Sequence, residues 1–229
     1  MPFLHVTTHI PNHPYDDLLR KKGGTGFPTL MFLDPEGNKL LKLSGRRTVK
    51  AFEEQLGNTE DYMGLVRKVR DGDNSLAGRL LIKQIELDML SYSEVQKRVE
   101  SLNKIYAKEL KKGGGSTMRA RIEAEKKHLA GLLIDVKVRS LVTKAGRDDK
   151  KHVDAGKQFL EMWKKEGRVP KGDAERYEFW RHIAHYADVE RDKQLFTEVV
   201  GEFRKSLGQD RNYSRMLGLL ERRLTEWDE

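Results

Sequence analysis

The 229-residue sequence contains no cysteine, and this absence excludes several kinds of chemistry at once. Without thiols the chain can form no disulfide, bind no metal through thiolate ligands and use no cysteine nucleophile. Long uncharged apolar runs are missing as well, so we expect no membrane span. The first residues lack the basic region and apolar core of a secretory signal peptide, so this chain alone predicts a cytoplasmic location.

Complete catalytic signatures are also missing. The glycine-rich segment KKGGGS (111–116) lacks the Gly-Lys-Ser/Thr ending of a phosphate-binding loop, and we expect a joint between helices there. No Ser-His-Asp set or pair of carboxylates can be identified from spacing. We therefore expect no catalytic residue, no cofactor and no enzymatic activity in the chain as it stands.

The positive charge is concentrated in one part of the chain. The formal net charge is +8. Residues 1–57 contain eight basic and six acidic residues, whereas residues 104–157 contain fifteen basic and seven acidic ones. A basic helical face attracts phosphate without reading sequence. Because zinc-finger spacing, an RNP-like aromatic motif and an obvious helix-turn-helix are all missing, we expect no specific nucleic-acid partner.

The first quarter of the sequence predicts a small mixed α/β segment. FLHVTTHI (3–10) favours a strand, and PYDDLLRKKGG (14–24) favours a short helix that ends at its glycines. The apolar run TLMFLD (29–34), the turn PEGN (35–38) and KLLKLSG (39–45) predict a β-hairpin. TVKAFEEQLG (48–57) predicts a helix with Thr48 as N-cap and Gly57 as its stop.

The remaining sequence predicts helices only. We expect them near residues 59–71, 75–90, 93–110, 117–142, 148–166, 173–187, 190–207 and 210–227. Ser93 with Gln96 fits a capping box, and short joints favour antiparallel pairs. Similar segments begin near 79, 128 and 179, which suggests tetratricopeptide-like stacking of helical hairpins, although the spacing exceeds the 34-residue tetratricopeptide period. The predicted organisation is α+β, with domains at 1–57 and 58–229.

The segment GFPTLMFLDPEGNKL (26–40) resembles the second half of a thioredoxin-like domain. In that family an apolar residue precedes a cis-proline, a buried strand follows, and a hairpin leads to the last strand and helix. The resemblance places Pro28 at the cis-proline and Phe27 before it, with Thr29 opening the strand. It therefore implies that Phe27, Pro28 and Thr29 bind substrate. X–Pro is the one peptide bond for which the cis form is inexpensive.

The resemblance covers residues 3–57 and leaves out the family's first half, which carries the Cys-x-x-Cys pair and a central strand. Three explanations stay open: a truncated chain, a small sheet that closes on the helical domain, or a second chain that donates the missing elements. Unpaired strand edges would favour self-association. With its long helical extension, the chain resembles bacterial thioredoxin-family proteins that are often exported.

Two functions follow as hypotheses. In intact form the protein would be a thiol–disulfide oxidoreductase or a redox-linked chaperone, and the chain as given is a redox-inert relative that binds a protein or peptide by strand addition. The alternative is a helical-repeat interaction scaffold with a degenerate β cap.

Histidines and arginines offer weaker candidates. His5, His9 and His13 have spacing compatible with Zn²⁺ or Cu²⁺, but prolines interrupt the segment and no carboxylate or thiol completes an obvious site, so we expect no metal. Arg46 and Arg47 precede a helix N-terminus and could bind an anion, although a solvated surface is the simpler interpretation.

Histidines and aromatics of the helical region are better interpreted as core. His182 and His185 lie three apart among apolar residues, which favours packing between helices over a ligand or acid/base pair. For the same reason we expect core positions for the aromatic residues at helical spacing, namely Phe159, Trp163, Tyr177, Phe179, Trp180, Tyr186, Phe196 and Phe203.

Overall fold

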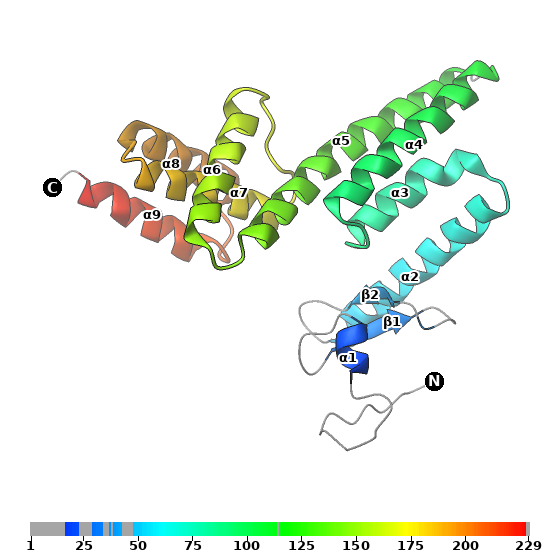
Figure 1. Cartoon of the computed structure of the whole chain (residues 1–229), viewed down its shortest axis with the longest axis horizontal. Coiled ribbons are helices and arrows are strands. Elements are labelled where there is room, and N and C mark those ends of the chain that lie inside the picture. Colours follow the sequence, from blue (N-terminus) through cyan, green and yellow to red (C-terminus); the bar gives the residue numbers. More distant parts are fainter. Residues whose placement is uncertain are drawn as a thin grey trace. The chain divides into compact units, whose positions relative to one another are not determined.

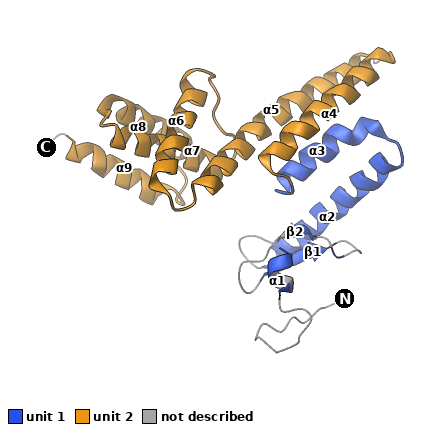
Figure 2. Cartoon of the chain, in the orientation of Figure 1, with its two compact units in different colours: residues 1–89 blue, residues 90–229 orange. Residues whose placement is uncertain are grey.

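The structure is a computed structural model that describes residues 17–22, 29–33, 37, 39–42, 48–113 and 115–227 (Figure 1). These residues are mostly helical and include one small antiparallel sheet, so the α+β composition predicted from the sequence is confirmed. The chain forms two compact units, residues 1–89 and 90–229 (Figure 2). The domain boundary predicted at 57/58 falls within a continuous helix of the first unit.

The first unit contains the sheet and the helices that follow it. Part of the helix expected at 14–24 is present, whereas the strand expected at 3–10 lies outside the described residues. The elements of this unit are α1 (Leu18–Lys21), β1 (Met31–Leu33), β2 (Lys39–Lys42), α2 (Val49–Arg70), the 3₁₀ turn η1 (Asn74–Leu76) and α3 (Ala77–Glu86).

Strands β1 and β2 form the predicted hairpin. They pair antiparallel, with Phe32 opposite Leu41, and a bulge follows Phe32. Gly37, in the connection, has φ +79°. Glycine reaches this left-handed region without steric cost, so the turn depends on it. On β2, Leu41 is buried. The described residues of the two predicted strands therefore pair as their patterns indicate.

Helix α2 confirms one predicted end and corrects the other. The Thr48 hydroxyl accepts a hydrogen bond from the backbone N–H of Ala51 (3.1 Å), which makes Thr48 the N-cap as predicted. The predicted stop at Gly57 is wrong, because the helix continues to Arg70. An internal glycine costs a helix only about 1 kcal/mol, and apolar residues continue at helical spacing to Val69. The helix ends instead beside Gly72, whose φ is +102°.

The second unit consists of helices that pack mainly on their neighbours in the sequence. One capping prediction is wrong: Ser91 and Glu94 form the capping box, two residues before the expected Ser93 and Gln96. The helix begins here because the Ser91 hydroxyl accepts from the backbone N–H of Glu94, while the Glu94 carboxylate accepts from the backbone N–H of Ser91. The helices are α4 (Tyr92–Lys111), α5 (Ser116–Ala145), α6 (Asp149–Lys164), α7 (Asp173–Val189), α8 (Lys193–Leu207) and α9 (Ser214–Glu226).

The main hydrophobic core lies among α5, α6, α7, α8 and α9. Trp163, Tyr177 and Tyr186 pack against it while partly exposed. The prediction that the aromatic residues form core is therefore confirmed; the five fully buried ones are Phe159, Phe179, Trp180, Phe196 and Phe203. Across the described part of the chain, no helix combines the length and apolarity that crossing a bilayer requires.

Candidate functional site

The residues that the thioredoxin-like resemblance assigns to substrate lie beside the start of β1. Thr29 is described and half-buried, two residues before the strand. Phe27 and Pro28 lie outside the described residues, so their substrate-binding role and the cis bond stay predictions. The same holds for His5, His9 and His13, and for Arg46 and Arg47.

Strand β1 presents an edge that no described strand covers. Among the described residues the sheet has two strands in the order β1–β2, so β1 has a partner on one side only. An uncovered edge exposes backbone N–H and C=O groups that pair readily with another extended chain. The described part of the first unit therefore contains the backbone requirement for strand addition.

Large apolar side chains are exposed on and beside β1 and on the helix α2 that packs against it. Phe52 of α2 packs against Phe32 of β1, with ring centroids 5.1 Å apart, yet Phe52 is 45% exposed. Leu33, at the end of β1, is 47% exposed. We call this set the β1 apolar surface; its members are Leu30, Leu33, Val49, Phe52 and Leu56, five of the seven large apolar residues that are exposed in the described chain.

A broad groove of about 460 Å³ lies between α2 and α3 in the same unit. Lys83 crosses it, donating a hydrogen bond to the Asn58 side chain (2.8 Å) and lying 3.8 Å from the Asp61 carboxylate. Three acidic and three basic residues line it, so the groove has no net preference for one sign of ligand. Its lining is Glu60, Asp61, Gly64, Leu65, Lys68, Leu76, Arg79, Ile82, Lys83 and Glu86.

In the second unit, His182 is a buried histidine whose pKa is strongly lowered. Its side chain is 1% exposed. Nδ1 lies 2.6 Å from the Glu178 carbonyl oxygen, and Nε2 lies 2.8 Å from Nδ1 of His152 on α6. Because a carbonyl only accepts, Nδ1 of His182 carries the hydrogen and Nε2 accepts from His152. Burial lowers the pKa of His182 to about 4.

These histidines act as structural links between α6 and α7. His185, the other residue of the predicted pair, lies 3.0 Å from the Asp149 carboxylate. It does not contact the same partner as His182. Within the described residues, no group of three or more histidine, aspartate or glutamate residues is arranged to bind a metal ion. The geometry thus fits the packing interpretation of His182 and His185.

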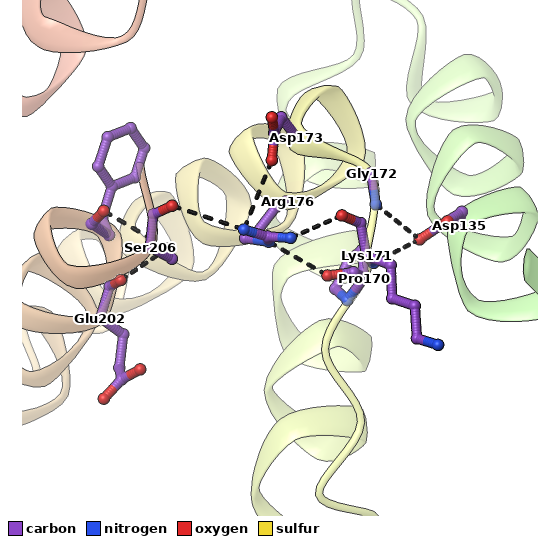
Figure 3. A network of polar contacts seen from close by, with 9 residues as sticks. Asp135, Pro170, Lys171, Gly172, Asp173, Arg176, Glu202 and Ser206 are labelled. Atoms are coloured by element: carbon purple, nitrogen blue, oxygen red, sulfur yellow. Dashed lines mark hydrogen bonds and ion pairs between the residues drawn. The ribbon is translucent and has the colours of Figure 1, made fainter. Parts of the chain in front are cut away.

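A polar network fixes the start of α7 (Figure 3). Arg176 donates to the carbonyl oxygens of Pro170 (3.2 Å) and Lys171 (2.6 Å), and reaches that of Ser206 at the end of α8 (3.5 Å). From α5, the buried Asp135 carboxylate accepts from the backbone N–H groups of Lys171 (2.8 Å) and Gly172 (3.5 Å). One arginine and one aspartate therefore tie three helices to the connection before α7.

Asp135→Ala is expected to lower the free energy of unfolding by about 2 kcal/mol, because two N–H groups lose a charged acceptor in a buried setting. The exposed carboxylate of Asp154 on α6 provides the matched control, and Asp154→Ala is expected to change stability by less than about 0.5 kcal/mol. Urea unfolding followed by tryptophan fluorescence measures both. Equal effects of the two substitutions would contradict the anchoring role.

Sequence reasoning missed three of these residues. His152 is thirty positions from His182, and only the packing of α6 on α7 brings them together. Arg176 has no local signal. Asp135 does have one, because it is a lone acidic residue inside the apolar run HLAGLLIDVKVRSLV (128–142), where a buried charge needs a partner.

Comparisons with known proteins add no relative to this picture: no protein-family model matches the chain, and neither curated proteins nor solved structures show a significant match.

Proposed function

We propose that this protein is a thioredoxin-like binding protein without thiol chemistry, which holds an extended segment of another polypeptide along the edge of β1. The observation that carries the proposal is the β1 edge, which no other strand covers among the described residues, together with the exposed apolar side chains of β1 and α2. An extended segment would pair with the strand backbone and bury its alternate side chains on the β1 apolar surface.

The order of elements supports this choice. A strand, an antiparallel partner strand and a helix follow the Gly-Phe-Pro-Thr segment, as the resemblance requires. The contact between Phe32 and Phe52 joins the strand to the helix. Strand addition needs only backbone groups and apolar pockets, so it does not depend on the cysteines that the chain lacks.

The side chains around the edge define the ligand class. Leu33 lies on one face of β1, while Leu30 alternates with it and falls on the face covered by Phe52. Their exposed fractions are 47%, 40% and 45%, respectively. A segment that alternates apolar side chains therefore finds an apolar contact on each face, and charged side chains at the same positions would be desolvated without a partner.

Leu33→Glu tests the proposal with a closely matched control. Leu219 on α9 is 48% exposed, against 47% for Leu33, so Leu219→Glu makes the same chemical change at a similarly exposed site. We expect the first substitution to weaken binding of a fluorescein-labelled valine–threonine alternating peptide at least about tenfold, or about 1.4 kcal/mol. The second should leave binding unchanged. Fluorescence anisotropy measures both dissociation constants.

Two further peptides make the result specific for strand addition. N-methylation of alternate backbone amides should abolish binding, because it removes the ladder hydrogen bonds but keeps the side chains. A proline-substituted peptide should fail for the same reason. The proposal is overturned if the wild-type protein does not bind the unmodified peptide, or if it binds the N-methylated peptide equally well.

A second candidate is a tetratricopeptide-like scaffold formed by the second unit. The observation that favours it is the packing of α6 on α7, α7 on α8 and α8 on α9, the pattern of stacked helical hairpins. Such a stack binds its partner on helix faces, so binding of a folded partner would survive Leu33→Glu. Strand addition would not, and the same variant therefore separates the two functions.

A further inference from the structure

Helix α4 has a lysine on each of four positions that share one face. Lys97, Lys104, Lys108 and Lys111 are spaced by seven, four and three residues, which places them within one narrow strip of an α-helix. All four side chains are exposed. The buried residues of the helix, Val95, Leu102 and Tyr106, lie on the opposite face. We call the four lysines the α4 lysine strip.

The packing of α4 on α5 fixes the direction of the strip. Tyr106 donates a hydrogen bond to the buried Glu125 carboxylate on α5 (2.6 Å). Arg121 of α5 pairs with Glu109 of α4 (2.8 Å). These contacts turn the buried side of α4 toward α5, so the helix cannot rotate to hide the lysines.

The charges of the strip are not used within the described chain. Several basic residues elsewhere pair with carboxylates, as Arg121 does with Glu109. Among the described residues, none of the four lysines lies within 4.0 Å of a carboxylate oxygen. The Glu94 carboxylate lies at one end of the strip, where its hydrogen bonds with Ser91, and to a smaller extent Arg98 and Lys97, lower its pKa.

Stabilisation of the helix itself explains only part of the pattern. Lys108 and Lys111 lie in the last turn of α4, where cations interact favourably with the helix dipole. That effect falls off within one turn, so it gives no reason for Lys104 or Lys97. A strip of about 21 Å, from a rise of 1.5 Å per residue over fourteen residues, remains to be explained.

We infer that the α4 lysine strip binds the phosphate backbone of duplex nucleic acid without reading its sequence. The face of the strip also carries one exposed acidic residue, Glu100, between Lys97 and Lys104, but no large exposed apolar or aromatic side chain. Binding to an anionic membrane would require apolar side chains on this face that insert into the lipid, and binding to a helix of another protein would require a row of apolar side chains. A phosphate backbone is the polyanion that point charges alone can bind, and single lysines suit it.

The salt dependence of binding is the measurement that tests the inference. A labelled DNA duplex of mixed sequence is titrated with the full chain between about 50 and 200 mM salt, where the logarithm of affinity falls by about 0.9 per neutralised phosphate. The triple variant Lys104→Gln, Lys108→Gln, Lys111→Gln should reduce that slope by about 2.7 and weaken binding at least about tenfold at the lowest salt.

A control of equal charge separates the strip from the net charge. The triple variant Lys144→Gln, Lys150→Gln, Lys157→Gln also removes three positive charges, at exposed sites of α5 and α6. It should keep the wild-type slope. Circular dichroism checks that both triple variants retain their helices.

Three results would overturn the inference. One is no duplex binding by the wild-type chain at about 50 mM salt, and another is an equal loss of slope in the two triple variants. The third is binding to vesicles of anionic phospholipid that exceeds binding to the duplex and depends on the strip, because the partner would then be a membrane. None of these readouts depends on β1, so failure here leaves the peptide-binding proposal intact.

Discussion

Gly156→Ala is expected to lower the free energy of unfolding by about 3 kcal/mol, the upper end for overpacking a well-packed interface. Gly156 lies on α6 where that helix crosses α7. A β-carbon at this position would lie 2.2 Å from the backbone carbonyl oxygen of His182 and 2.8 Å from Cβ of Tyr186. Because the carbonyl belongs to a helix backbone, no side-chain rotation relieves the contact, and the two helices must separate.

The separation would be costly because the crossing carries much of the core. Phe159 and Phe179 meet there with ring centroids 5.2 Å apart, and both are fully buried. Interiors at this density lose dispersion contacts when a gap of even half an ångström opens. The hydrogen bond between His152 and His182 lies one helical turn from Gly156, so it should lengthen as well.

The chain offers a matched control in Gly201, which lies inside α8 and is exposed. No heavy atom lies within 4 Å of a β-carbon added at Gly201. Gly201→Ala should therefore stabilise the protein by about 0.5–1 kcal/mol, the usual gain when alanine replaces glycine in a helix interior. The two substitutions are chemically identical and are expected to have opposite signs.

Urea unfolding followed by tryptophan fluorescence measures this difference. Trp163, Trp180 and Trp227 are the only tryptophans of the chain, and all belong to the second unit. The signal therefore reports the unit in which both glycines lie, even if the two units unfold separately. Similar free energies of unfolding for Gly156→Ala and Gly201→Ala would show that α6 and α7 do not approach each other closely at Gly156.

Gly156 also shows where sequence reasoning stops. Its neighbours have ordinary helical periodicity, which predicts helix at 148–166 and agrees with α6 at Asp149–Lys164. Periodicity identifies the buried side of a helix, but not which residue of a second helix lies opposite. That pairing depends on crossing angle and position along both helices, and it is the reason that a glycine is required.

Sequence signals predicted structure more reliably where the interaction joins residues close in sequence. Thr48 caps α2 because its hydroxyl needs only an N–H three residues away. The helix end predicted at Gly57 was wrong because glycine weakens a helix without ending it. Helix α2 ends only near Gly72, which has a positive φ. For the candidate site, the pairing of β1 with β2 follows from the hairpin pattern, whereas Phe27 and Pro28 lie outside the described residues.

The second large effect concerns pH, since His182 is buried in its neutral form. Burial lowers its pKa to about 4 from the ordinary value of 6.5. In the unfolded chain His182 takes up a proton near pH 6.5, but in the folded protein only near pH 4. The contribution to stability is therefore complete above pH 6.5 and is lost as the pH falls toward 4. A difference of this size corresponds to about 3 kcal/mol.

Hydrogen-bond geometry at Nε2 adds to the effect of burial in resisting protonation of His182. A proton added to Nε2 of His182 would point at Nδ1 of His152, which already donates its hydrogen there. The nearby Arg181 and His152 add positive charge, while Glu178 offers partial compensation through its carboxylate and backbone carbonyl. Neutral His182 satisfies both ring nitrogens, whereas charged His182 leaves two donors facing each other.

His182→Gln is expected to destabilise the protein by about 2 kcal/mol at pH 8, because packing and hydrogen bonds are lost. When the pH is lowered from 8 to 4, the free energy of unfolding of this variant should fall by about 3 kcal/mol less than that of the wild type, because the variant lacks the group that resists protonation. Urea unfolding at a series of pH values, followed by tryptophan fluorescence, gives both numbers. The exposed His128 supplies the control, and His128→Gln should keep the wild-type pH dependence.

The imidazole signals of wild-type protein in a proton NMR titration test the same claim without a mutation. The His182 ring should keep its neutral chemical shift well below pH 6.5 and change only as the protein approaches the pH range in which it loses stability. If this ring titrates with an ordinary pKa while the protein stays folded, then His182 is not buried between α6 and α7. An unchanged pH dependence in His182→Gln would lead to the same conclusion by an independent route.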